Sequence, residues 1–315
     1  MTSPSTQRVV EVDGPKGGIG MTVVAAAPRG RREDRRLRTL VLILLAPAVA
    51  LVFTSVVVPT LIALADSFQH EGRWTVANYA SFVVEAPYLR VMSNTLVIAL
   101  IVTGLCIALS APAAAFLAAQ DQRAAAILLG LLAASLWISV LVRIYSWQVL
   151  LARVGPINQM LQALGFTAEP VPFLYTRGAV VVSMVQFLIP YATMMMYAGM
   201  RRVDWELVTA ARTLGASLTT VSIQIYWPQV RFAVTSAALV VFMIATSFFV
   251  SPAILGGPRD IMIGMQMHSD LVNRYESGMA ATTGVILTAI LLVVAWIALR
   301  AGGTSFRRLA TALDR

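Results

Sequence analysis

Six long apolar runs alternate with polar segments along this chain. They cover residues 40–65, 91–119, 124–151, 179–200, 232–255 and 279–299. Each run is long enough to cross the hydrocarbon core of a bilayer, which takes about 20 residues of helix. The pattern predicts an all-α integral membrane bundle of six transmembrane helices.

Composition and charge support a membrane protein and indicate its orientation. The chain is 58% hydrophobic and 12% charged, with a mean hydropathy of +0.77, whereas soluble domains carry about 25% charged residues. The formal charge of +9 does not indicate nucleic acid, because many arginines precede the first apolar run and mark a cytoplasmic flank. These arginines are Arg29, Arg31, Arg32, Arg35, Arg36 and Arg38. We therefore expect both termini on the cytoplasmic side (N-in/C-in).

The polar segments define the expected domains. Residues 1–38 are predicted to be a disordered cytosolic tail, residues 39–302 a six-helix transmembrane domain, and residues 303–315 a second cytosolic tail. A cleaved signal peptide is disfavoured, because the run 40–65 is longer than the roughly 7–15 apolar residues of such peptides.

The cytoplasmic segment 201–229 is too polar to span a membrane but has helical order. Asp204 can cap a helix whose first turn holds Glu206, Gly215 is a natural stop, and Pro228 can open the fifth span. One apolar face is predicted at the helical spacing, formed by Leu207, Ala210, Ala211 and Leu214. Small alanines at its centre favour docking in a groove of a partner protein. An interfacial helix on lipid is the alternative.

This segment resembles the EAA loop of ABC importer permeases. The residues at the spacing of that motif are Ala210, Ala211, Gly215, Ile225 and Pro228, whereas Thr209 replaces its Glu and Trp227 its Leu. The resemblance implies a coupling helix that docks on the ATPase subunit. The implied contact residues are Glu206, Leu207, Thr209, Ala210, Ala211, Leu214, Gly215, Ile225 and Pro228.

Other stretches are similar to the spermidine/putrescine permease subfamily. They are Trp74–Tyr79, the sequence Arg143-x-Tyr145-x-Trp147, and Ser251–Gly257. The resemblance implies a type I ABC importer permease of the bacterial inner membrane that forms half of an alternating-access pathway for a small solute such as a polyamine. The implied partners are an ATPase dimer, a second related permease and a periplasmic or lipid-anchored solute-binding protein. ATP and Mg²⁺ would bind the ATPase, and no cofactor is expected on this chain.

Three residues of the third run are candidates for the substrate pathway: Arg143, Tyr145 and Trp147. Arg143 is the one formal charge well inside an apolar run, and such residues are often functional. It can equally fix the bundle by pairing or snorkelling, and a cation facing the pathway would repel a polyamine. The two aromatic residues can gate the pathway or form an interfacial belt.

Other function classes fit the sequence less well. The only lysine, Lys16, follows Pro15, so the chain has no P-loop, which needs Gly before Lys. A stand-alone secondary transporter of a small solute is the alternative, but such carriers usually place carboxylates or histidines in their spans, and the six runs contain neither. We expect no catalytic residue and no metal site.

Overall fold

The computed structural model describes residues 31–70 and 72–302, and the chain divides into two compact units at Thr60 and Leu61. Five helices are long and apolar enough to cross a membrane, and a bent helix pair would make a sixth crossing if it counts as one span. Residues 1–30 and 303–315, which include most of both predicted tails, lie outside the described residues. Residues 31–38 were expected in the first tail, but they are helical.

Helix α1 (Arg31–Asp66) contributes the described part of the first unit. It contains Pro47 and Pro59. The hydroxyl of Ser55 donates to the carbonyl of Leu51 at 2.7 Å. In lipid, polar groups must find partners within the protein, and this bond satisfies the hydroxyl within the helix.

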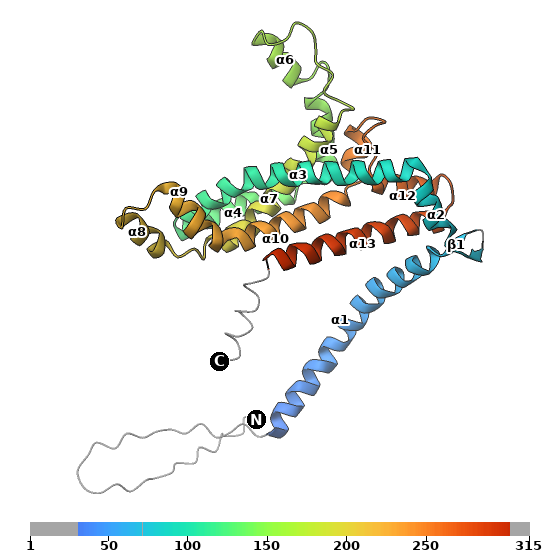
Figure 1. The fold of residues 1–315 in the computed structure, drawn as a ribbon, viewed down its shortest axis with the longest axis horizontal. Helices are drawn as coiled ribbons and strands as arrows, with labels where there is room; N and C mark the ends of the chain where they lie inside the picture. The colour runs from blue at the N-terminus through green and yellow to red at the C-terminus, as the bar shows by residue number, and fades with distance from the viewer. Residues whose placement is uncertain (1–30, 71, 303–315) are drawn as a thin grey trace, which may run out of the picture. The chain divides into compact units, whose positions relative to one another are not determined.

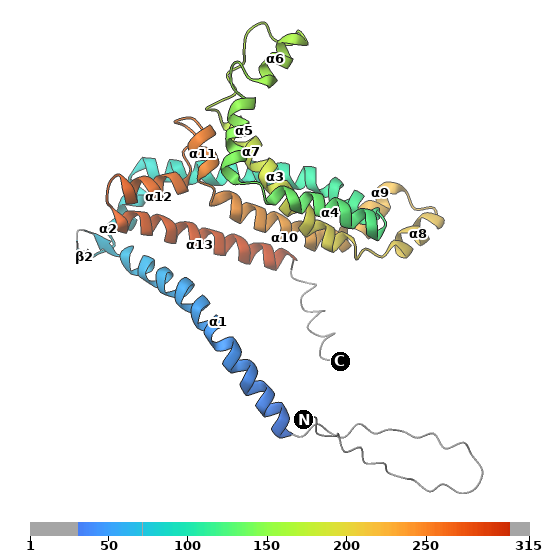
Figure 2. The same cartoon turned by 180° about the vertical axis from the view of Figure 1, so that it is seen from behind.

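Three helices form the core of the second unit: α3 (Ala86–Ala119), α7 (Arg177–Met200) and α10 (Trp227–Thr246) (Figures 1 and 2). Helix α13 (Ser277–Gly302) lies beside α10. Close helix approach depends on small residues. A Cβ at Gly199 of α7 would clash with Ala233 of α10. The apolar helices thus pack into a bundle, and small residues set the distance between neighbouring helices.

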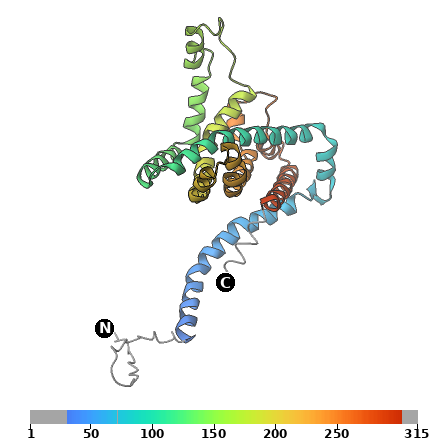
Figure 3. The ribbon, with the colours of Figure 1, turned by 60° about the vertical axis from the view of Figure 1, so that its left-hand side comes forward.

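The third apolar run is bent, which corrects the predicted continuous span 124–151. Helices α4 (Gln122–Leu136) and α5 (Val140–Leu150) meet at 86°. The break at residues 137–139 contains no proline, whereas Pro112 and Pro190 lie inside the unbroken helices α3 and α7. Figure 3 shows α5 leaving the bundle toward α6 (Pro156–Ala163).

The fifth run and the following loop also differ from expectation. A continuous helical stretch comprises α9 (Leu218–Val221), the π-helix η1 (Ser222–Tyr226) and α10, and it ends at Thr246. The rest of the predicted span 232–255 forms the separate helix α11 (Val250–Leu255). The predicted loop 256–278 contains α12 (Ile263–Val272). Its apolar residues were too few to predict a span.

The second unit has two ends with different elements (Figure 1). We call one the α12 end. It carries α12, the short helix α2 (Ala77–Val84) and the antiparallel strands β1 (Gln69–His70) and β2 (Arg73–Trp74). The other, the α8 end, carries α8 (Trp205–Thr213) and α9.

Candidate functional site

The α8 end contains the segment that resembles the EAA loop, and side-chain caps define its helices. The carboxylate of Asp204 accepts from the backbone N–H groups of Glu206 at 3.0 Å and Leu207 at 3.3 Å. Gly215 adopts a left-handed φ of +88°, where glycine is favoured. The next N–H, of Ala216, donates to the carbonyl of Ala211 at 3.0 Å. The predicted start and stop signals of this helix are thus confirmed.

None of the described residues of α8 is buried. Leu207 is 55% exposed and Leu214, at its end, is 88% exposed. Ala210 is also exposed, whereas Ala211 is half-buried. The helix contacts the bundle on its other side, where Val208 packs against the core. Most of the predicted apolar face therefore points away from the rest of the chain.

The connection from α8 to α10 is anchored at both ends. The N–H of Asp204 donates to Oε1 of Gln229 at 2.9 Å, and the ring of Trp205 lies 6.1 Å from that of Tyr226. Ile225 is half-buried in η1, and Pro228 is the second residue of α10. Pro228 stands in the first turn of α10, but the helical stretch already begins at Leu218, so the predicted opening of the fifth helix at Pro228 is wrong.

The two polar positions of the motif face solvent. Glu206 lies exposed in the first turn of α8. Thr209 occupies the position that is Glu in the EAA motif. Its hydroxyl donates to the carbonyl of Trp205 at 2.9 Å. Its side chain is thus satisfied within α8. Any contact that the Glu of the motif makes would have to be supplied by another residue of this chain.

Arg143 lies in α5 and is 7% exposed. Its guanidinium carbon lies 5.2 Å from the ring centroid of Phe187, a cation–π contact. None of its three side-chain nitrogens has a hydrogen-bond partner among the described residues. Burial of such a group is costly without an acceptor.

The structure does not bring the three pathway candidates together. Tyr145 is 55% exposed, whereas Trp147 is half-buried and packs near Ile144 and Leu255. Residues four apart share a helix face and residues two apart do not. Arg143 and Trp147 therefore share one side of α5, and Tyr145 points elsewhere.

Two polar networks, each built around a buried carboxylate, hold the α12 end together, and sequence reasoning missed both. In the first, Arg177 of α7 pairs with Asp260 through Nε at 3.2 Å. Its Nη2 donates to Oδ1 of Asn94 at 2.6 Å, and Nδ2 of Asn94 donates to the carbonyl of Ile261 at 2.9 Å. Asp260 is 6% exposed. The network connects α3 and α7 to the loop before α12.

The second network surrounds Asp270 of α12, which is fully buried. Its Oδ1 accepts from Gln266 at 2.9 Å and from the hydroxyl of Tyr88 at 3.3 Å, and Nη1 of Arg274 lies 3.5 Å away. Burial raises the pKa of the Asp270 carboxyl above its ordinary value. The i,i+4 spacing of Asp270 and Arg274 is a sequence signal for this pair.

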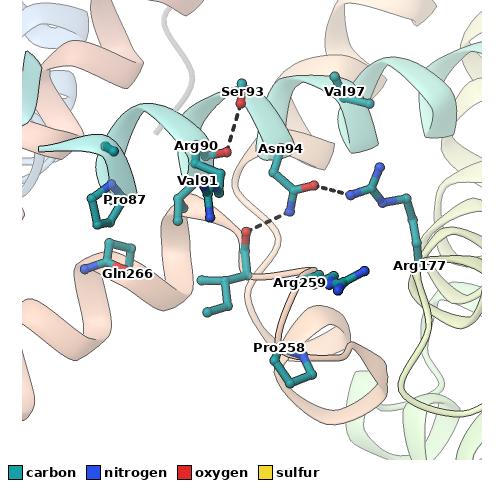
Figure 4. A pocket seen from close by; sticks show the side chains of 12 residues that line it. Pro87, Arg90, Val91, Ser93, Asn94, Val97, Arg177, Pro258, Arg259 and Gln266 are labelled. Carbon is teal, nitrogen blue, oxygen red and sulfur yellow. Dashed lines mark hydrogen bonds between the residues drawn. The ribbon is translucent and has the colours of Figure 1, made fainter.

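A cavity of about 710 Å³ opens beside the first network (Figure 4). It lies between the start of α3, the start of α7 and residues 258–266. Three arginines line it, namely Arg90, Arg177 and Arg259, together with Asn94 and Gln266. These side chains come from segments far apart in the sequence, so no local motif predicts the cavity.

Known proteins resemble this chain in sequence and in fold. No protein-family profile matches it. The spermidine/putrescine transport system permease protein PotB of Salmonella typhimurium is 31% identical over 230 residues, covering 72% of this chain and 80% of the relative. PotB of Escherichia coli is also 31% identical, with 83% of the relative covered.

The solved structures extend the likeness to the fold. A chain of a bacterial alginate ABC transporter, crystallised in complex with an alginate pentasaccharide-bound periplasmic protein, superposes with a TM-score of 0.71. It covers 87% of this chain and 99% of its own length at 15% identity. Together with the relatives in sequence, the arrangement of apolar helices is thus that of a multi-pass permease of the bacterial inner membrane. This chain belongs to the family of ABC importer permeases that includes PotB.

Proposed function

We propose that this permease forms half of the ATP-driven translocation pathway for a polyamine, with α8 as the helix that couples it to an ATPase. The exposed apolar face of α8 carries the proposal. Apolar side chains such as Leu207 and Leu214 lose contact with water when a partner covers them, which favours association. A cap at one end and a glycine stop at the other hold this face in place.

The proposal fixes an orientation and a set of partners. With both termini in the cytoplasm, the α8 end faces an ATPase dimer, which binds ATP and Mg²⁺. The α12 end then faces outward, toward a solute-binding protein. A second, related permease completes the pathway, because the helices of this chain form only one half. The arginines that precede the first apolar run support this orientation.

The substrate class follows from the named relatives. The PotB proteins of Salmonella typhimurium and Escherichia coli are spermidine/putrescine permeases by name, and we propose putrescine or spermidine for this chain. Nothing in the comparisons supports the alternative of a secondary transporter.

We retain Arg143, Tyr145 and Trp147 as proposed pathway residues. Arg143 is a buried cation without a described acceptor, so its contribution is expected to be repulsion of a passing ammonium rather than binding. Trp147 shares its helix face, where an aromatic ring can contact a cation. Uptake of radiolabelled putrescine by Arg143→Gln and Trp147→Ala variants, compared with Tyr145→Ala, separates the two faces of α5.

Co-purification tests the coupling role. The chain is expressed with its ATPase, and Ala210→Glu places a charge at the centre of the exposed face of α8. We expect at least about tenfold less ATPase recovered, since charge in an apolar docking site is costly. Ala168→Glu, at an exposed alanine outside α8, is the control and should retain the ATPase. Equal recovery with both variants would contradict the coupling role of α8.

A further inference from the structure

The arginine-lined cavity at the α12 end, defined above, is large enough for a ligand or the tip of a protein loop. Its volume of about 710 Å³ lies within the range of known ligand pockets, roughly 300–1,000 Å³. Apolar and polar groups alternate along its wall, where Pro87 and Val97 accompany Asn94 and Gln266. Figure 4 shows its lining contributed by α3, α7 and the loop before α12.

The three arginines of this cavity are not equivalent. Arg177 is held by Asp260 and Asn94, as described above. Arg90 and Arg259 are exposed, and no described residue pairs with either guanidinium. No carboxylate lines the cavity. The cavity therefore keeps a positive charge that Asp260 offsets only at Arg177.

The positive charge of the cavity determines which kind of group can bind there. A polyamine is a polycation, so Arg90 and Arg259 would repel it. Guanidinium groups instead match the planar, two-oxygen geometry of a carboxylate. Two unpaired guanidinium groups from different segments can approach one carboxylate from two sides. The cavity thus fits an anion and is unsuited to the proposed substrate.

The backbone around the cavity is held in place before any occupant binds. A Cβ at Gly257 would lie 2.5 Å from the carbonyl oxygen of Tyr175, so the loop passes close to the start of α7. The N–H of Gly257 donates to Oδ2 of Asp260 at 3.3 Å, and Asn94 holds the carbonyl of Ile261. A preorganised site binds at a lower entropic cost than one that must be ordered.

We propose that this cavity receives an acidic side chain of the solute-binding protein when that protein docks on the α12 end. The inference rests on the proposed function, which places the α12 end outward and supplies the binding protein as partner. Arg90 and Arg259 provide the unpaired charges, and the fixed loop provides the shape. Charges of this kind mainly accelerate and orient docking.

A docking measurement in nanodiscs tests the proposal. The intact transporter, with its second permease and ATPase, is embedded in zwitterionic lipid, and binding of the purified solute-binding protein is followed by biolayer interferometry. Arg90→Glu and Arg259→Glu are compared with Arg153→Glu, which reverses an exposed arginine that does not line the cavity. Equal ATPase recovery and equal melting temperatures show that the variants are folded.

We expect Kd to rise about fivefold for each cavity variant and at least about tenfold for the double variant, with a slower association rate. The difference from wild type should shrink as salt screens the charges. Charge reversal of one acidic residue on the binding protein should restore docking to Arg90→Glu or Arg259→Glu. Docking that matches the Arg153→Glu control at every salt concentration would overturn the proposal.

A lipid headgroup is the competing occupant. If the cavity variants dock normally in zwitterionic nanodiscs but lose bound anionic lipid in native mass spectrometry, the cavity is a lipid site and the proposal fails. The substrate assignment is tested by a separate binding measurement. Failure of putrescine or spermidine to bind the solute-binding protein would refute the polyamine proposal and leave the docking result intact.

Discussion

The two ends of the second unit use polar side chains in opposite ways. At the α8 end, none of the described residues of α8 is buried, and its polar groups act as caps or face solvent. At the α12 end, Asp260 and Asp270 are buried and bond across segments distant in sequence. One end exposes an apolar helix face, whereas the other is held together by polar contacts between its own segments.

The difference has a physical consequence for substitutions. Removing a partner from a buried polar group leaves that group unsatisfied and costs stability. Changing an exposed residue affects stability little, but it can remove a binding contact. Variants of the buried polar residues at the α12 end should therefore lower the free energy of unfolding, and variants on the face of α8 should change association.

The largest expected effect is from Gly278→Val at the α12 end. A Cβ at Gly278 would clash with the carbonyl of Gln69 and lie 2.8 Å from Nδ2 of Asn78. We expect a loss of about 3 kcal/mol, because the backbone must shift to relieve this overpacking. Thermal unfolding in detergent measures it. Gly104→Val is the matched control, since nothing lies within 4 Å of a Cβ there. Equal melting temperatures would show that the α12 end is loosely packed.

Asp270→Ala should have an intermediate effect. It removes the acceptor of Gln266 and Tyr88, and we expect a loss of about 2 kcal/mol.

Asp270→Asn tests the charge of the same residue through pH. Because burial raises the pKa of Asp270, the folded state binds this proton more tightly than the unfolded state does. Stability should therefore rise as pH falls from neutral through the raised pKa. The Asn variant should lack this rise, and Glu276→Gln, which alters an exposed carboxylate nearby, should keep it. Identical pH profiles for the Asn variant and the wild type would assign the dependence to another group.

The smallest expected effect is from Gly215→Ala at the α8 end. Space is open around Gly215, but its φ of +88° is unfavourable for alanine. We expect a cost of about 1 kcal/mol, confined to the end of α8. Hydrogen exchange should show faster exchange at Leu214 and Ala216 with little change in the melting temperature. A global loss of stability would indicate that α8 is more tightly integrated than its exposure suggests.

The sequence predicted the α8 end well because its signals are local. The cap at Asp204 and the stop at Gly215 each depend on a few neighbouring residues. The positions of the long helices followed from apolar runs of sufficient length. Both kinds of signal are present in a short window of sequence.

The remaining features depend on contacts between distant segments. The bend between α4 and α5 occurs without proline, and the split between α10 and α11 lies inside an apolar run. The cavity arginines Arg90 and Arg259 come from α3 and from the loop before α12. Their proximity arises from tertiary packing, which hydrophobic periodicity does not encode.

The π-helix η1 has a consequence for the angular phase of the helical stretch that follows α8. It lies within one continuous helical stretch, between α9 and the first turn of α10. Each residue of an α-helix advances the chain by about 100°, and a π-turn holds one residue more than an α-turn would. Because the wider π-turn absorbs its extra residue locally, deleting one residue from η1 would let the stretch continue as an α-helix with little rotation of α9 relative to α10. A residue inserted into the α-helical part of the stretch would instead change the phase by about 100° and redirect Leu207 and Leu214.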